Sequence, residues 1–98
     1  MSDLAQILRE DRRLVLLRLL ADGDDYCANL YLLHAALPGF GHATSEDQVR
    51  TDLEWLSEQG LVKVSAPGGV PLAKLTSRGE DVATGRARVP GVKRPRPE

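Results

Sequence analysis

The stretch that most constrains the fold runs from residue 44 to residue 64 and reads TSEDQVRTDLEWLSEQGLVKV. Ser45 is a good helix N-cap, and Gln48 follows at the spacing that closes a capping box. Apolar residues then recur at helical spacing until Gly60, which favours the left-handed backbone that ends a helix. A short apolar run follows at once. The sequence therefore predicts a helix that leads directly into a strand.

The residues after this helix predict a β-hairpin. Residues 61–64 alternate weakly and include β-branched side chains, the turn APGG follows, and a second strand-like run covers residues 70–75. Thr76 or Ser77 then caps a short final helix, which Gly85 ends. The predicted fold class is therefore mainly α with a small β-hairpin (α+β).

The first half of the chain predicts two further helices. Ser2 is the expected cap of the first, which becomes densely apolar beyond the polar patch EDRR at residues 10–13 and ends near Gly23. A brief strand near Tyr26 leads into a second helix over residues 29–37. The apolar face at the start of the first helix either packs on the same domain or is covered by self-association as a homodimer; its members are Leu4, Ile7 and Leu8.

Length and composition indicate one small globular domain. The chain has 98 residues, of which 42% are hydrophobic and 28% charged, as is usual for such domains. The longest apolar run, residues 14–21, contains Arg18 and is too short to cross a bilayer, and no signal peptide is visible. We therefore expect a cytoplasmic protein without a membrane partner.

The formal charge of −1 hides a strong asymmetry along the chain. Residues 86–98 hold five cations and one carboxylate, whereas residues 1–85 hold eight cations and thirteen carboxylates. Three prolines within residues 86–98 predict that this segment is extended and mobile. The sequence thus predicts a folded domain over 1–85 and a basic, Pro-rich extended tail over 86–98. Such a tail fits a polyanionic partner, and the alternative is a solubilising segment without one.

Several segments carry a resemblance to known proteins. Through VRTDLEWLSEQGLVKV and LTSRGEDVATG, the predicted order of helix, helix, helix, hairpin and helix resembles the winged-helix DNA-binding superfamily, especially ArsR-like regulators. From REDRRLVLLRLL through TDLEWLSEQGLV to VPGVKRP, the chain is also similar to small winged-helix proteins of Mu-like bacteriophages. The resemblance implies a winged helix-turn-helix fold, transcriptional regulation and a place in the host bacterial cytoplasm.

The resemblance also implies duplex DNA as the partner. The 45–59 helix would lie in the major groove, the 61–75 hairpin would be the wing, and the tail would add phosphate contacts. The implied DNA-binding residues are Ser45, Gln48, Arg50, Thr51, Lys63, Lys74, Arg78, Lys93, Arg94 and Arg96.

The charge of the 45–59 helix favours a second interpretation. This helix carries five carboxylates and Arg50 as its only cation, and phosphates repel carboxylates. The alternative is a winged-helix protein–protein interaction module in phage DNA packaging or assembly, with a phage or host protein as partner. Trp55 lies beside the apolar stripe and is the candidate interface residue of this helix, although core packing is the commoner use of tryptophan.

No motif predicts an enzyme, a cofactor or a metal site. The spacing of Cys27, His34 and His42 fits no compact zinc site, and the paired-cysteine motif of metal-sensing ArsR-like regulators is missing. Neither a nucleophile motif nor a phosphate-binding loop is present in the sequence. We therefore expect a binding protein that works without a cofactor.

Overall fold

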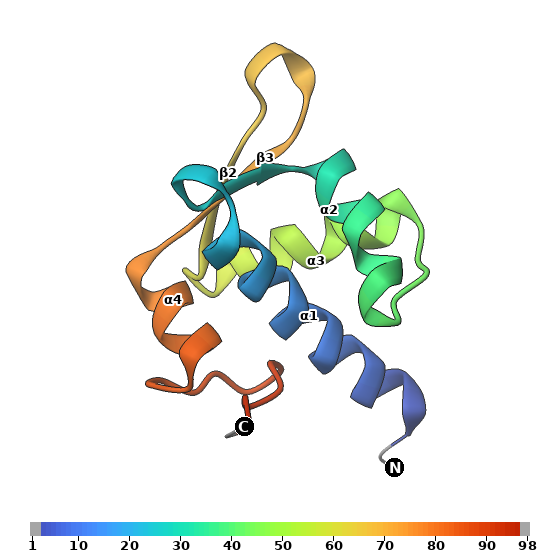
Figure 1. Cartoon of the computed structure of the whole chain (residues 1–98), viewed down its shortest axis with the longest axis vertical. Helices are drawn as coiled ribbons and strands as arrows, with labels where there is room; N and C mark the ends of the chain where they lie inside the picture. Colours follow the sequence, from blue (N-terminus) through green and yellow to red (C-terminus); the bar gives the residue numbers. More distant parts are fainter. Residues whose placement is uncertain (1–2, 97–98) are drawn as a thin grey trace.

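Helices and short strands follow one another along the chain in this computed structural model, which describes residues 3–96. Within that range the fold is α+β, with four α-helices and a three-stranded antiparallel sheet, which confirms the predicted class. Figure 1 shows α1 crossing the centre of the molecule, with the β2–β3 hairpin projecting at one end. The elements are α1 (Leu4–Asp22), β1 (Cys27–Asn29), α2 (Leu30–Ala36), α3 (Glu46–Glu58), β2 (Val62–Ser65), β3 (Leu72–Leu75) and α4 (Ser77–Thr84).

Each α-helix is preceded by a cap residue whose side chain accepts a hydrogen bond from a backbone N–H of the first turn. The predicted cap Ser45 is confirmed, because its hydroxyl accepts from the N–H of Gln48 at 3.0 Å. The expected capping box is wrong: within residues 3–96 the Gln48 side chain accepts no hydrogen bond from the Ser45 N–H, and its amide donates to Asp52 instead. Ser2 lies outside the described residues. The caps of the other three helices are Asp3, Asn29 and Thr76.

The sheet has the order β1-β3-β2, so the predicted hairpin is joined by a third strand from the first half of the chain. The predicted strand near Tyr26 lies at Cys27–Asn29, where it pairs antiparallel with β3. Gly60 has a φ of 76° and ends α3 as expected. After the hairpin, α4 returns so close to the start of β2 that a Cβ on Gly79 would lie 2.1 Å from the carbonyl oxygen of Leu61.

The second half of α1 forms the centre of the hydrophobic core, as its density of leucines predicts. Leu16, Leu17 and Leu20 are completely buried and pack in one cluster with side chains from every other helix and from β2 and β3. Burial of apolar side chains on this scale is the main force that holds the helices against the sheet.

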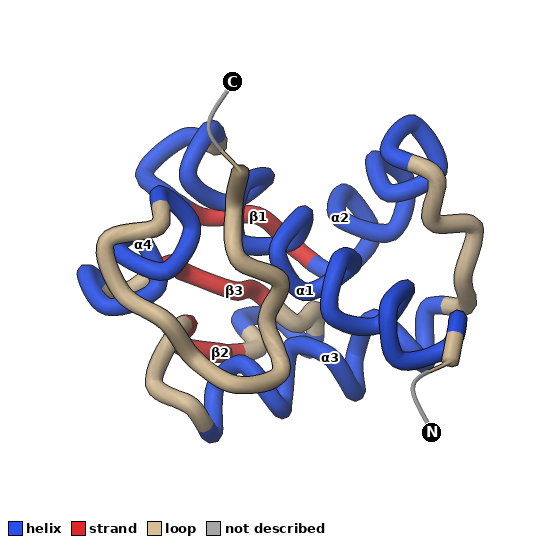
Figure 2. Tube along the Cα trace, turned by 90° about the horizontal axis from the view of Figure 1, so that it is seen from below, coloured by secondary structure: helices blue, strands red, loops and turns tan. Residues whose placement is uncertain are grey.

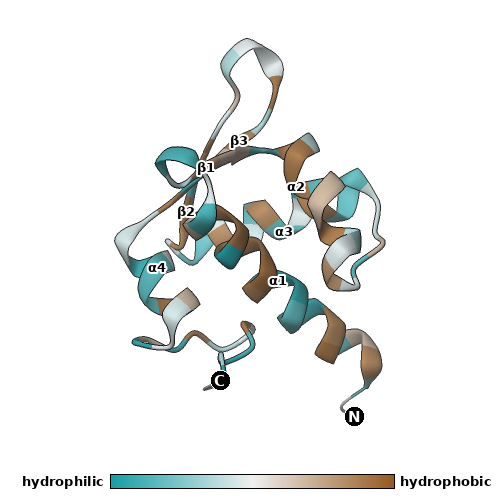
Figure 3. Ribbon diagram, viewed as in Figure 1, coloured by the Kyte–Doolittle hydropathy of each residue, from teal (hydrophilic) through white to brown (hydrophobic). Residues whose placement is uncertain are grey.

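The first turns of α1 project beyond this core (Figure 3). Leu4, Ile7 and Leu8 are 67%, 56% and 41% exposed, so they do not pack on their own domain. The first of the two expectations for this face is therefore wrong, and self-association stays a prediction.

The C-terminal segment, residues 86–96, folds back over α1, as Figure 2 shows. Val89 is only 5% exposed in the core, and the N–H of Lys93 donates to the carbonyl oxygen of Glu10 at 3.1 Å. The segment forms neither helix nor strand, as its prolines predict, but it is not the free extended tail we expected. The reason is that Val89 and Val92 give it two apolar anchors among its cations.

Candidate nucleic-acid interface

The four candidate DNA-binding residues in and next to α3 differ in how free their side chains are to contact DNA. Thr51 is exposed, and Arg50 is half-buried at the edge of a groove. Ser45 is exposed, but its hydroxyl serves as the helix cap. Gln48 is half-buried, and its amide donates to Asp52 at 3.2 Å. Arg50 and Thr51 are therefore the members of this set whose polar groups have no partner within residues 3–96.

A shallow groove of about 320 Å³ separates α3 from the hairpin. Its wall on α3 is formed by Arg50, Leu53 and Glu54, and its wall on the hairpin side by Val64, Ser65, Ala66 and Pro71. The groove is thus mostly apolar, with one cation and one carboxylate at its edge. It is the place where the structure brings the exposed flank of α3 and the hairpin together.

The lysines of the hairpin do not lie in this groove. Lys63 and Lys74 are direct partners across β2 and β3, and both are exposed. Side chains alternate between the two faces of a strand, so these lysines point away from the face that carries Val62 and Val64. Arg78 is at the other end of α3, where its Nε donates to the carbonyl oxygen of Gln59 at 3.1 Å.

The exposed surface of α3 is acidic. Asp52, which the sequence counts among the five carboxylates, is only 1% exposed and forms an ion pair with Arg12 of α1. The four other carboxylates are exposed, and two of them lie in the first turn, where they suit the positive end of the helix dipole. These four are Glu46, Asp47, Glu54 and Glu58.

A cluster of polar contacts that sequence reasoning missed joins α1 to its neighbours; we call it the polar junction. Arg12 donates from Nε and Nη2 to the two carboxylate oxygens of Asp52, the second at 3.1 Å. Next to it, the guanidinium of Arg13 lies 3.8 Å from the centre of the Trp55 ring and donates to the carbonyl oxygen of Gly91 at 2.9 Å. Trp55 is therefore partly covered by the C-terminal segment of its own chain.

Asp11 completes the polar junction. Its carboxylate is 2.7 Å from Nε2 of the buried His42 and 3.2 Å from Nζ of Lys93. Burial alone would raise the pKa of Asp11, but the hydrogen bonds from these two partners outweigh burial, so the pKa lies below its ordinary value. The signal in the sequence is the patch EDRR, which interrupts the apolar pattern of a helix that crosses the core.

The candidate residues of the C-terminal segment divide into two kinds. All three are exposed and line hollows in the surface, but Lys93 forms an ion pair with Asp11, whereas no ion pair is found for Arg94 or Arg96 within residues 3–96. Figure 1 places this segment at the end of the molecule opposite the hairpin. The ten candidate residues thus lie on several surfaces and do not form one patch.

Residues 3–96 contain no group of three or more histidine, cysteine or acidic side chains that could hold a metal ion. His34 has its Nε2 2.7 Å from the carbonyl oxygen of Thr44, and Cys27 is a half-buried free thiol in β1. In the same residues no helix has the length and apolar character needed to cross a membrane.

Comparison with known proteins gives two relatives. The Escherichia phage Mu protein named "Uncharacterized protein gp26" is 55% identical over 91 residues, which cover 93% of this chain and 94% of the phage protein. The chain belongs to the gp26 family. A Haemophilus influenzae protein is 39% identical over 74 residues, covering 74% of this chain and 72% of its own length. The expected relation to a Mu phage protein is confirmed, whereas no family model and no solved structure matches the chain.

Proposed function

We propose that this member of the gp26 family is a winged helix-turn-helix protein of the ArsR-like type that binds duplex DNA. The observation that carries the proposal is the position of α3: its Ser45-capped start is exposed, and its flank borders a projecting hairpin. The order α1-β1-α2-α3-β2-β3-α4 is the order in which such proteins present a recognition helix and a wing. Regulation of phage transcription in the bacterial cytoplasm is the role that this arrangement suits.

Within this proposal, Arg50 and Thr51 contact DNA from α3, and the hairpin contacts the neighbouring backbone. A homodimer formed through the first turns of α1 would present two copies of α3, and paired recognition helices are common in helix-turn-helix proteins. The exposed face of Leu4, Ile7 and Leu8 supports such a dimer.

The test is binding of the purified chain to a fluorescent 30-base-pair duplex, measured by anisotropy over a series of KCl concentrations. The logarithm of the affinity should fall linearly with the logarithm of the salt concentration. Arg50→Ala should weaken binding severalfold, because it removes the only cation on α3. The matched control is Arg9→Ala, which removes the same charge from an exposed position of α1. Equal affinities of the wild type, Arg50→Ala and Arg9→Ala would contradict the proposal.

The acidic surface of α3 supports a second candidate function, docking on a basic protein partner in phage DNA packaging or assembly. With four exposed carboxylates against one cation, this surface is net negative, so it would repel phosphates but attract lysine and arginine side chains. This function predicts negligible duplex binding at 150 mM salt. It also predicts binding to a protein partner, and the double variant Glu54→Lys/Glu58→Lys should abolish that binding. Capture of phage proteins from infected cells by the wild type, with the double variant as control, distinguishes the two candidates.

A further inference from the structure

The C-terminal segment concentrates positive charge around two hollows in the surface. Within residues 86–96 there are five cations and no carboxylate. A hollow of about 580 Å³ lies between the segment and α1 and is lined by Arg88, Lys93 and Arg94 among others. A second hollow, of about 590 Å³, is lined by Arg94 and Arg96 together with Thr84, Gly85 and Pro95. Glu10 is the one carboxylate in either lining.

The segment is held in place by groups other than these arginines. Val89 is buried in the core, the carbonyl oxygen of Gly91 accepts from Arg13, and the N–H of Lys93 donates to α1. The backbone next to Arg88 and Arg94 is therefore held in place without a ligand. A ligand that binds them does not have to offset the entropy of fixing that backbone.

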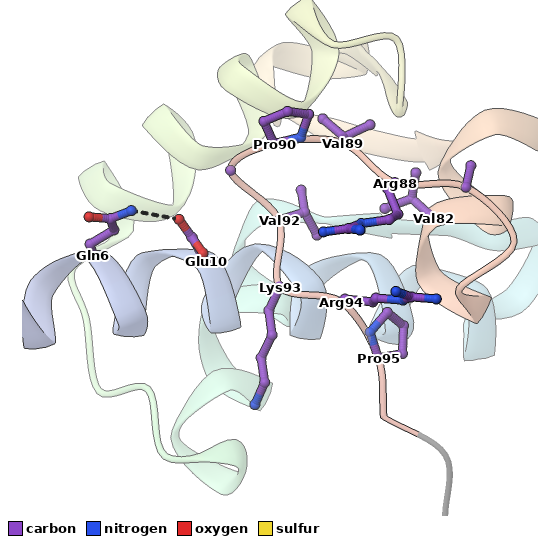
Figure 4. A pocket seen from close by; sticks show the side chains of 12 residues that line it. Gln6, Glu10, Val82, Arg88, Val89, Pro90, Val92, Lys93, Arg94 and Pro95 are labelled. Carbon is purple, nitrogen blue, oxygen red and sulfur yellow. Dashed lines mark hydrogen bonds between the residues drawn. The ribbon is translucent and has the colours of Figure 1, made fainter. Parts of the chain in front are cut away.

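The charges of the arginines are not balanced by nearby carboxylates. In the part of the chain that the structure describes, no ion pair joins a carboxylate to Arg88, Arg94 or Arg96. Lys93 differs, because its ammonium group lies against Asp11, and Figure 4 shows its side chain directed away from Arg88 and Arg94. Glu10 accepts a hydrogen bond from the Gln6 amide at 3.1 Å.

We infer that Arg88, Arg94 and Arg96 form a binding site for phosphate groups, and that its ligand is the backbone of duplex DNA. The planar guanidinium group binds phosphate oxygens in pairs, which a lysine ammonium cannot do. In choosing DNA as the ligand, this inference rests on the proposed function. It adds a phosphate site whose lining shares no residue with the groove between α3 and the hairpin, and it assigns Lys93 to holding the fold.

The test uses the full chain with two probes, a 20-base-pair random duplex and sodium tripolyphosphate. The variant Arg88→Ala/Arg94→Ala should bind the duplex at least tenfold more weakly at 100 mM KCl, with a salt slope smaller by about two. The control Arg9→Ala/Arg18→Ala removes the same charge from exposed positions of α1 and should change the affinity less than threefold. Arg88→Lys/Arg94→Lys keeps the charge and should recover only part of the affinity. The circular dichroism spectrum of each variant checks that it is folded.

The two probes separate the phosphate site from the proposed function. Duplex binding that is unchanged by Arg88→Ala/Arg94→Ala overturns the site and leaves the proposed function standing. A third outcome is that the wild type binds tripolyphosphate but not the duplex, and that the same variant loses tripolyphosphate binding. That result supports a site for free polyphosphate and overturns DNA as its ligand. A wild type that binds neither probe at 100 mM KCl overturns both.

Discussion

The ion pair between Arg12 and Asp52 gives the sharpest prediction about stability. Both side chains are almost completely buried, and the contact joins α1 to α3 through two hydrogen bonds. Asp52→Asn keeps the shape of the side chain but leaves the buried guanidinium without a counter-charge. Removal of one member of such a pair costs about 3–5 kcal/mol, a large share of the roughly 5–15 kcal/mol that stabilises a typical domain.

The structure also predicts how this loss can be reversed. Replacement of both partners, as in Arg12→Met/Asp52→Leu, removes the buried charges together and should leave stability within about 1 kcal/mol of the wild type, or raise it. Glu54→Gln is the control, because it removes an exposed carboxylate from the same helix and should change stability by less than about 0.5 kcal/mol.

Urea denaturation measures all three variants. Trp55 is the only tryptophan of the chain and lies in the polar junction, so its fluorescence reports unfolding directly. With an m-value of about 1.5 kcal/mol/M, Asp52→Asn should lower the midpoint by about 2–3 M. The reasoning would be refuted by a cost below about 1 kcal/mol for Asp52→Asn, or by a double variant less stable than this single one.

Three further changes test the packing and the charges. Gly79→Ala should lower the melting temperature by several degrees in a thermal scan, although alanine usually favours helices by about 1 kcal/mol, because its Cβ would lie 2.1 Å from the carbonyl oxygen of Leu61. Gly39→Ala, which meets no atom within 4 Å, is the control. The lowered pKa of Asp11 means that its contacts stabilise the fold above about pH 4 and are lost in acid, so Asp11→Asn should cost about 1 kcal/mol at pH 7 and progressively less as the pH falls below about 4. Gly91→Ala should destabilise the chain by about 1–3 kcal/mol and shift the tryptophan emission. Gly91 has a φ of 101°, which strains an alanine, and the new Cβ would lie 2.8 Å from the indole ring of Trp55.

Local signals in the sequence were sufficient for most of the secondary structure. Ser45 and Gly60 mark the ends of α3 by short-range hydrogen bonding and backbone conformation, which depend on few neighbours. The spacing of leucines in α1 likewise indicates which half crosses the core. The sequence indicates the short strand near Tyr26 but not its pairing with β3, because Cys27–Asn29 finds its partner far along the chain.

The candidate interface was less predictable, because it depends on which charges remain exposed. Asp52 counts as an acidic surface residue in the sequence, but a cation from another helix draws it into the interior. Lys93 was expected to bind DNA, and the structure pairs it with Asp11 across most of the chain. Neither outcome follows from periodicity, because both depend on which helices become neighbours in three dimensions.

The polar junction also has a consequence for the lifetime of the folded state. Its contacts join residues separated by 31 positions, from Asp11 to His42, and by 78, from Arg13 to Gly91. Closing such long loops has an entropic cost, so these contacts should form late, after the helices and the hairpin. Interactions that are absent from the folding transition state govern the rate of unfolding and leave the folding rate nearly unchanged. A chain with a weakened junction should therefore refold at the normal speed but unfold more often, and an added protease should cleave it faster.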